Sequence, residues 1–217
     1  KASKAALDKV LTKAILERSG IPVPRYVIFE KDDFKIDDCY DLGFPVVVKP
    51  HLEGSSIGLS VVNTKGELLE AIDKAFQYGE LALIEEHIAG RELTVGILDD
   101  EPLPVIEIVT RGNLYDYQAK YADLDTRYLV PAPIGEETAR EAQSLGKRSH
   151  LALGCRCFSR VDMMMDSLSR LFVLEANTIP GMTERSLLPK AAQAIGLSFG
   201  NLCIRLIENA LKDERMI

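Results

Sequence analysis

RVDMMMDSLSRLFVLEAN, residues 160–177, is the stretch that decides the fold. Two apolar runs flank the polar segment DSLS, and this pattern predicts a β-hairpin. Because strand side chains alternate between the two faces of a sheet, a turn centred between Leu168 and Ser169 fixes which residues share a face. Four polar side chains then share one face, as the opposed pairs Asp162–Glu175 and Arg160–Asn177. The other face is the core face, with Val161, Met163, Phe172, Leu174 and Ala176.

Two carboxylates that lie directly opposite each other repel, so Asp162 and Glu175 would destabilise a bare hairpin. A divalent cation removes this repulsion. Two carboxylates and the amide of Asn177 are hard oxygen ligands, which suit Mg²⁺, with Mn²⁺ as a substitute. The alternative is a surface hairpin with solvated acids. The apolar flanks and the Pro-Gly loop at 180–181 favour the metal site.

The composition argues against several classes of protein. A chain of 217 residues suits one domain or two closely joined subdomains. The formal net charge of -7 argues against a nucleic-acid partner. No apolar run approaches the ~20 residues of a membrane helix, so we expect no membrane partner and a cytoplasmic location. The cysteines show no zinc-ligand spacing, and we expect reduced thiols at Cys39, Cys155, Cys157 and Cys203.

Helical and extended patterns alternate along the chain. We expect helices at 4–19, 64–78, 136–153, 186–195 and 199–212. We expect strands at 25–29, 44–50, 59–62, 81–86, 92–98, 103–109, 160–165 and 171–175. Strands adjacent in sequence pair in an antiparallel way with helices between them, which predicts an α+β fold. A capping box of Thr64 and Glu67 begins the second helix. The buried face of the first helix is expected at Leu7, Val10, Leu11, Ala14 and Ile15.

The sequence HLEGSSIG, residues 51–58, lies between two of these strands. Its small residues allow backbone N–H groups to turn toward an anion, and Lys49 ends the preceding strand with a charge that points the same way. A hairpin with a glycine-rich turn is the alternative. Acids follow at Glu85, Glu86 and Glu92, where a charged surface hairpin is the alternative. The long irregular segment at 121–133 indicates a functional loop.

An ordered set of motifs runs nearly the whole length of the chain: VVVKP, EGSSIG, LIEEHIAGRELT, YDYQAKYAD, SRVDMMMD and LEANTIPGMTERSLLP. This set resembles the ATP-grasp ligases and, within them, the D-alanine–D-alanine ligase family. The resemblance implies an ATP-grasp fold. Two subdomains, about 1–85 and about 86–217, would hold the nucleotide between antiparallel sheets.

The resemblance also implies roles for residues that match the family's ATP site. The lysines that contact the ATP phosphates match Lys9, Lys49 and Lys120. Glu85 matches the acid that contacts the adenine amino group, and the backbone at Glu86 and Ile88 matches the groups that contact the adenine edge. Glu92 matches the acid that binds the ribose. The magnesium ligands match Asp162, Glu175 and Asn177, in agreement with the hairpin argument.

The remaining matches concern the amino acids. In the family, ATP phosphorylates the carboxylate of a first D-alanine, and the amine of a second D-alanine attacks the acylphosphate. Ser55 and Tyr121 match a latch between the glycine-serine flap and the long loop. Arg160 and the backbone at Gly181 match the groups that bind the oxyanion. Ser186 and Leu187 match positions that hold the carboxylate of the second amino acid.

Two alternatives stay open. One is a ligase that joins D-alanine to D-lactate or D-serine, although the pair Lys120 and Tyr121 favours D-alanine as second substrate. The other is an ATP-binding module without independent catalysis, because family members carry a further N-terminal domain before the first helix. We expect the full-length protein to be a homodimer.

Overall fold

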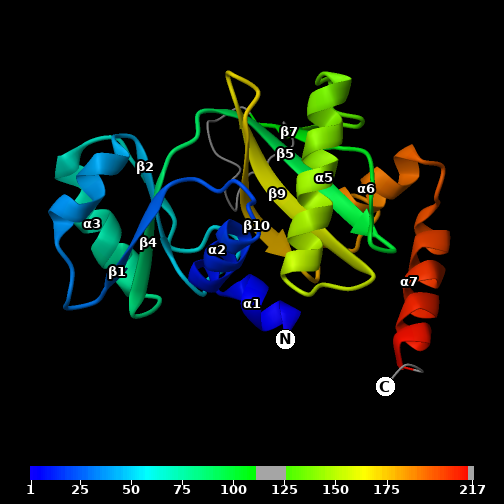
Figure 1. Ribbon diagram of the computed structural model, residues 1–217, viewed down its shortest axis with the longest axis horizontal. Coiled ribbons are helices and arrows are strands. Elements are labelled where there is room, and N and C mark those ends of the chain that lie inside the picture. The colour runs from blue at the N-terminus through cyan, green and yellow to red at the C-terminus, as the bar shows by residue number, and fades with distance from the viewer. Residues whose placement is uncertain (111–125, 215–217) are drawn as a thin grey trace.

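The computed structural model describes residues 1–110 and 126–214. The fold is α+β, as predicted, and contains two antiparallel sheets that lie side by side (Figure 1). The first sheet has the strand order β1-β4-β2-β3. The second has the order β10-β9-β5-β7-β8, with β6 paired to β5. No helix in the described part of the chain is both long and apolar enough to span a membrane.

The first sheet consists of β1 (Tyr26–Glu30), β2 (Val46–Pro50), β3 (Ser60–Val62) and β4 (Leu81–Glu86). Helix α3 (Lys65–Phe76) packs on it, and the 3₁₀ helix η1 (Ile36–Leu42) follows β1. Their apolar side chains form one core cluster, which includes Phe29, Val46, Val48, Leu68, Ile72 and Ile84. From the end of β4 the chain passes directly to the second sheet (Figure 1).

The second sheet consists of β5 (Gly90–Leu98), β6 (Glu101–Pro102), β7 (Ile106–Val109), β8 (Arg127–Leu129), β9 (Phe158–Asp166) and β10 (Leu171–Asn177). Helix α5 (Glu136–Ala152) approaches β5 at Val95, where a Cβ on Gly146 would lie 3.0 Å from the valine Cβ. Helix α6 (Leu187–Ala194) approaches at the next residue, Gly96. Because neighbouring residues of a strand face opposite ways, α5 and α6 cover opposite faces. Helix α7 (Phe199–Glu214) packs against α6.

The first helix differs from the prediction. It is two helices, α1 (Ala2–Leu7) and α2 (Lys9–Arg18), separated at Asp8, whose backbone is extended. The Asp8 carboxylate accepts a hydrogen bond from Leu11 N at 3.0 Å and caps α2, which is why the helix restarts there. The predicted apolar face is wrong at Leu7 and Leu11, which are 54% and 41% exposed, whereas Val10, Ala14 and Ile15 are half-buried. The buried residues of α2 are instead Thr12, Lys13 and Leu16.

Two smaller predictions need correction. Thr64 is the N-cap of α3, but its side chain makes no capping hydrogen bond, so the capping box is not formed. The Glu67 carboxylate accepts instead from the backbone of Asn63 at 3.0 Å. The strand predicted at 103–109 begins only at Ile106, and β6 precedes it. The other predicted elements agree with the structure to within a few residues at their ends, whereas η1 and β8 are elements that the sequence does not predict.

The β9–β10 hairpin pairs the predicted residues, but its register next to the turn differs from the prediction. Asp162 pairs with Glu175 and Arg160 with Asn177, as predicted. On the other side of Asp162, however, Met163 pairs with Val173, so Leu174 is an extra residue at a bulge. The predicted core face is therefore wrong at Phe172 and Leu174, which are only half-buried. The buried residues are Leu171, Val173 and Ala176 of β10, with Val161 and Met163 of β9.

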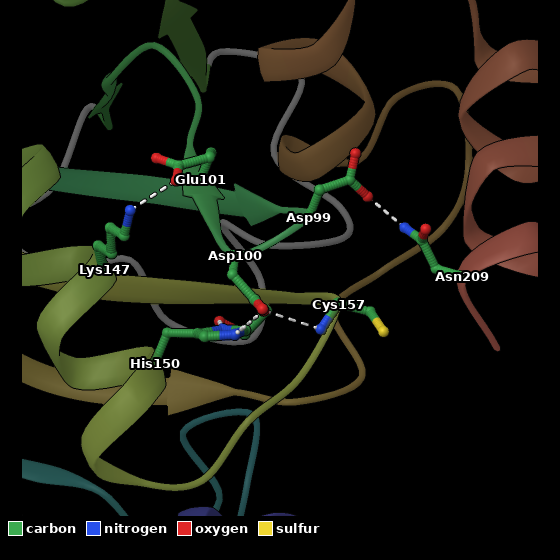
Figure 2. Close-up of polar contacts among 8 residues, drawn as sticks. Asp99, Asp100, Glu101, Lys147, His150, Cys157 and Asn209 are labelled. Carbon is green, nitrogen blue, oxygen red and sulfur yellow. Dashed lines mark hydrogen bonds and ion pairs between the residues drawn. The ribbon is translucent and has the colours of Figure 1, made fainter. Parts of the chain in front are cut away.

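A polar network that joins the exposed Asp100 to the buried His150 lies at the far end of the second sheet, around the turn between β5 and β6 (Figure 2). The Asp100 carboxylate accepts hydrogen bonds from His150 Nε2 at 2.9 Å and from Cys157 N at 3.0 Å. His150 Nδ1 lies 2.7 Å from the hydroxyl of Ser159. Ser159 and His150 are fully buried, so a substrate cannot reach them. The network anchors α5 to the β5–β6 turn and to β9.

Candidate functional site

A cavity of about 510 Å³ lies between the two sheets. Its size is that of a small-molecule site. The first sheet contributes Val47, Lys49 and Glu85, and the loop after β2 contributes Glu53 to Ile57. The second sheet contributes Glu92, Ile108, Asp162, Met164, Leu174 and Glu175. The wall from the first sheet thus carries Lys49 beside Glu85, and the wall from the second sheet carries Asp162 and Glu175.

The predicted metal ligands come together at one end of this cavity. Asn177 Nδ2 lies 2.9 Å from Asp162 Oδ2 and 3.5 Å from Glu175 Oε1. A half-turn of the Asn177 amide presents its oxygen in place of its nitrogen, so the three residues offer two carboxylates and one amide oxygen. This donor set fits Mg²⁺. Across the described residues, no group of three or more His, Cys, Asp and Glu side chains offers a rival metal site.

Asp162 is held rigidly. Thr94 Oγ1 donates to its Oδ1 at 2.6 Å, and Arg160 donates from Nε and Nη2 at 2.8 and 2.7 Å. A bidentate arginine–carboxylate pair fixes the plane of both groups. Asp162 is almost completely buried, so these donors also compensate for the loss of hydration. The carboxylate is therefore fixed at the point where a cation would bind.

Two lysines, Lys9 and Lys49, also line this cavity. Lys9 Nζ donates to the backbone carbonyl of Glu53 in the glycine-serine loop. Burial lowers the pKa of Lys9, and the nearby Glu175 partly offsets this effect. Lys49 Nζ lies 2.8 Å from Glu85 Oε2. Both ammonium groups line the cavity and can neutralise a phosphate chain.

A second, wider cavity of about 1030 Å³ adjoins the first and shares Lys9, Glu53, Ser55 and Glu175 with it. Its lining includes Arg160, Asn177, Gly181, Ser186 and Leu187. Ser186 is the N-cap of α6, and its hydroxyl accepts from Thr183 N at 3.0 Å. The N-terminus of a helix favours a carboxylate through its unpaired N–H groups and its dipole. The two cavities meet at the acids and the glycine-serine loop.

Three comparisons place this geometry among known proteins. Residues 15–208 match the family model described as the D-ala D-ala ligase C-terminus. The D-alanine–D-alanine ligase of Syntrophotalea carbinolica is 44% identical over 96% of this chain, which spans 68% of that relative. The corresponding ligase of Haemophilus influenzae is 42% identical over 97% of the chain and 72% of that relative.

The chain belongs to the D-alanine–D-alanine ligase family. Two solved structures agree. The Bacillus anthracis ligase complexed with ATP superposes with a TM-score of 0.87, at 32% identity, over 99% of this chain and 69% of that one. VanG D-Ala:D-Ser ligase from Enterococcus faecalis superposes with a TM-score of 0.85, at 33% identity, over 95% of this chain and 62% of that one. The ATP-grasp fold predicted from the sequence is confirmed.

The residues predicted to contact the adenine lie at the end of β4 and just after it. The Glu86 carboxylate is engaged by Arg25, and it accepts from Arg25 N at 2.9 Å and from Arg25 Nε at 2.8 Å. Only the backbone of Glu86 is left to contact a base, as the prediction requires. Ile88 and Glu92 line the cavity as well. The individual roles predicted for these family positions stay predictions, as do the boundaries of the two subdomains.

The family latch and the third lysine cannot be placed, because Lys120 and Tyr121 lie outside the described residues. Their expected partner Ser55 lines both cavities, with a backbone φ of 51°. Arg160 and Gly181 both line the second cavity, and their role at the oxyanion stays a prediction.

Sequence reasoning missed three features of this ligase-family site. Lys13 lies 2.8 Å from Glu85 Oε1, and its position four residues after Lys9 on a helix was the available signal. Met164 lines the cavity because it shares a face of β9 with Asp162, and strand alternation was the available signal; Leu174 lines it because of the bulge, for which the sequence gives no signal. The guanidinium of Arg91 forms a bidentate pair with Glu107 at 2.6 and 2.7 Å, and these hydrogen bonds raise the pKa of Arg91.

Proposed function

We propose that this chain joins two D-alanine molecules into D-alanyl-D-alanine, with ATP and Mg²⁺, for the synthesis of peptidoglycan precursors. The observation that carries the proposal is the place of Asp162, Glu175 and Asn177 at the junction of the two cavities. A nucleotide in the narrow cavity directs its terminal phosphate toward this junction. An amino-acid carboxylate in the wide cavity reaches the same point.

The chain's own groups have distinct roles in this proposal. Lys9 and Lys49 neutralise the phosphates, and bound Mg²⁺ would add charge neutralisation of the phosphoryl group. A carboxylate oxygen of the first D-alanine takes the γ-phosphoryl group of ATP, the bond from the γ-phosphorus to the bridging oxygen breaks, and an acylphosphate and ADP result. The amine of the second D-alanine attacks its carbonyl carbon, the amide bond forms, and phosphate leaves.

The groups around the wide cavity assist the second step. Arg160 and the N–H of Gly181 bind the oxygen that gains negative charge, and preorganised donors are effective there. The N-terminus of α6 at Ser186 and Leu187 holds the carboxylate of the second D-alanine. The glycine-serine loop lies over the junction and keeps water from the acylphosphate.

Joining D-alanine to D-serine is the second candidate, because the similarity to VanG D-Ala:D-Ser ligase is nearly as extensive. The test is phosphate release with mass analysis of the product, using purified protein, ATP, Mg²⁺ and D-alanine alone or with D-serine or D-lactate. D-alanyl-D-alanine as main product supports the proposal, and a mixed product as the main one contradicts it. ATP binding without any product would favour the alternative of an ATP-binding module without independent catalysis. The cytoplasmic location and the homodimer of the full-length protein stay predictions.

A further inference from the structure

Lys13 is a buried lysine that does not line either cavity. It is 1% exposed, and its ammonium lies 2.8 Å from Glu85 Oε1. Glu85 is 2% exposed, and its other oxygen lies 2.8 Å from Lys49. One carboxylate is therefore flanked by two ammonium groups, one from α2 and one from β2.

This arrangement fixes both the charge and the orientation of Glu85. Burial opposes its ionisation, but Lys49 and Lys13 together hold the pKa of Glu85 below its usual value. A buried ammonium is costly unless a carboxylate accompanies it, so Lys13 and Glu85 depend on each other. The ring of Tyr26, with its centroid 5.4 Å from Lys13 Nζ, packs beside the ammonium and limits its movement.

The orientation matters because Glu85 lines the narrow cavity and Lys13 does not. An ionised carboxylate only accepts hydrogen bonds. It attracts an amino group on the edge of a base and repels a carbonyl oxygen at the same position. If Glu85 were free to rotate, or were neutral, this discrimination would weaken.

We propose that Lys13 is a positioning residue that holds Glu85 for a purine with an amino group, as in ATP, and against one with a carbonyl oxygen, as in GTP. This inference rests on the proposed function. Lys49 cannot replace Lys13, because Lys49 also lines the cavity where the phosphates would lie. Among the described residues, Lys13 forms an ion pair with Glu85 alone.

The test is calorimetric binding of ATP and of GTP, each with Mg²⁺, to the wild-type protein and to Lys13→Met, which keeps an unbranched side chain without its charge. We expect the ratio of ATP to GTP affinity to fall about tenfold or more. This fall corresponds to the loss of roughly one charge-assisted hydrogen bond between Glu85 and the amino group of the base. Lys13→Gln gives the same readout if Lys13→Met does not fold. In a Glu85→Gln background, the change at Lys13 should have no further effect on the ratio.

Thr12→Val is the matched control. Thr12 is equally buried on α2, and its hydroxyl donates to Ala5 O at 2.7 Å, away from Glu85. It should lower the melting temperature and leave the ATP-to-GTP ratio unchanged. An unchanged ratio in Lys13→Met, or an equal fall in Thr12→Val, overturns the inference and leaves the proposed function intact. A wild-type protein that binds neither nucleotide overturns both.

Discussion

Asp162 faces Glu175 across β9 and β10 because Leu174 is an extra residue in β10. Next to the turn the strands pair Met163 with Val173, and without the bulge Asp162 would face Leu174. The bulge therefore brings two carboxylates together, and it places the Leu174 side chain in the wall of the narrow cavity. One irregularity thus shapes both the metal end and the apolar wall of the site.

Glu175→Gln should weaken Mg²⁺-ATP binding about tenfold or more, because one charged ligand of the cation is lost. The half-buried side chain contributes little to the core, so the melting temperature should change by only a few degrees. Calorimetry with Mg²⁺ and with EDTA separates the metal-dependent part of the affinity. Asp166→Asn is the control, since this acid of β9 pairs with Arg170 at the turn and lines neither cavity. Equal binding by wild type and Glu175→Gln would contradict the metal assignment.

The sequence predicts this pairing correctly for a partly wrong reason. A turn centred between Leu168 and Ser169 gives the right partners for Asp162 and Arg160. In the structure Asp166 N donates to Arg170 O, so the turn is centred on Leu168 and the bulge supplies the missing shift. The alternation of apolar and polar residues along a strand cannot locate a bulge, because packing across the whole sheet determines where the extra residue lies. The prediction of the core face fails between the turn and the bulge for that reason.

The fold class could be predicted because apolar periodicity and strand order are local signals. The buried face of α2 could not be predicted from such local signals. Periodicity favours Leu7 and Leu11, but the structure buries Thr12 and Lys13, because each finds a polar partner far from it in sequence or on the neighbouring helix. A lysine is assigned to the surface by composition rules, and only the position of Glu85 in three dimensions reverses that assignment.

Leu174→Ala should weaken ATP binding several-fold, up to roughly tenfold, since about 1 kcal/mol of apolar contact with the bound nucleotide is lost. The bulge itself should persist, so the dependence on Mg²⁺ should stay as in the wild-type protein. Leu168→Ala is the control, because this leucine is 72% exposed at the hairpin turn. If Leu174→Ala binds ATP as tightly as Leu168→Ala does, the bulged residue does not contact the nucleotide.

Gly58→Ala should lower the free energy of unfolding by about 1–3 kcal/mol. Gly58 has a φ of 71°, and an added Cβ would lie 2.7 Å from Pro50 Cγ and 2.8 Å from Tyr78 Cδ2. It should also weaken ATP binding, because Gly58 ends the loop that lies over the phosphate end of the cavity. Gly54→Ala, at the other end of the loop, meets no atom within 4 Å and should change stability by less than about 1 kcal/mol. Chemical denaturation measures both, and equal losses would contradict the packing argument.

His150→Gln should flatten the dependence of stability on pH between pH 7.5 and 5.5. Burial lowers the pKa of His150, and Asp100 only partly offsets this effect. As the pH falls below about 6.5, the unfolded chain therefore binds more protons than the folded one. The contribution of His150 to the free energy of unfolding is complete above that pH and is lost on acidification. The loss has an upper limit of about 1.4 kcal/mol per pH unit for one group. Burial also lowers the pKa of His87, so His87 should account for the dependence of stability on pH that remains in the variant. Denaturation at several pH values measures both slopes, and an identical slope in His150→Gln would mean that the network around Asp100 does not titrate on unfolding.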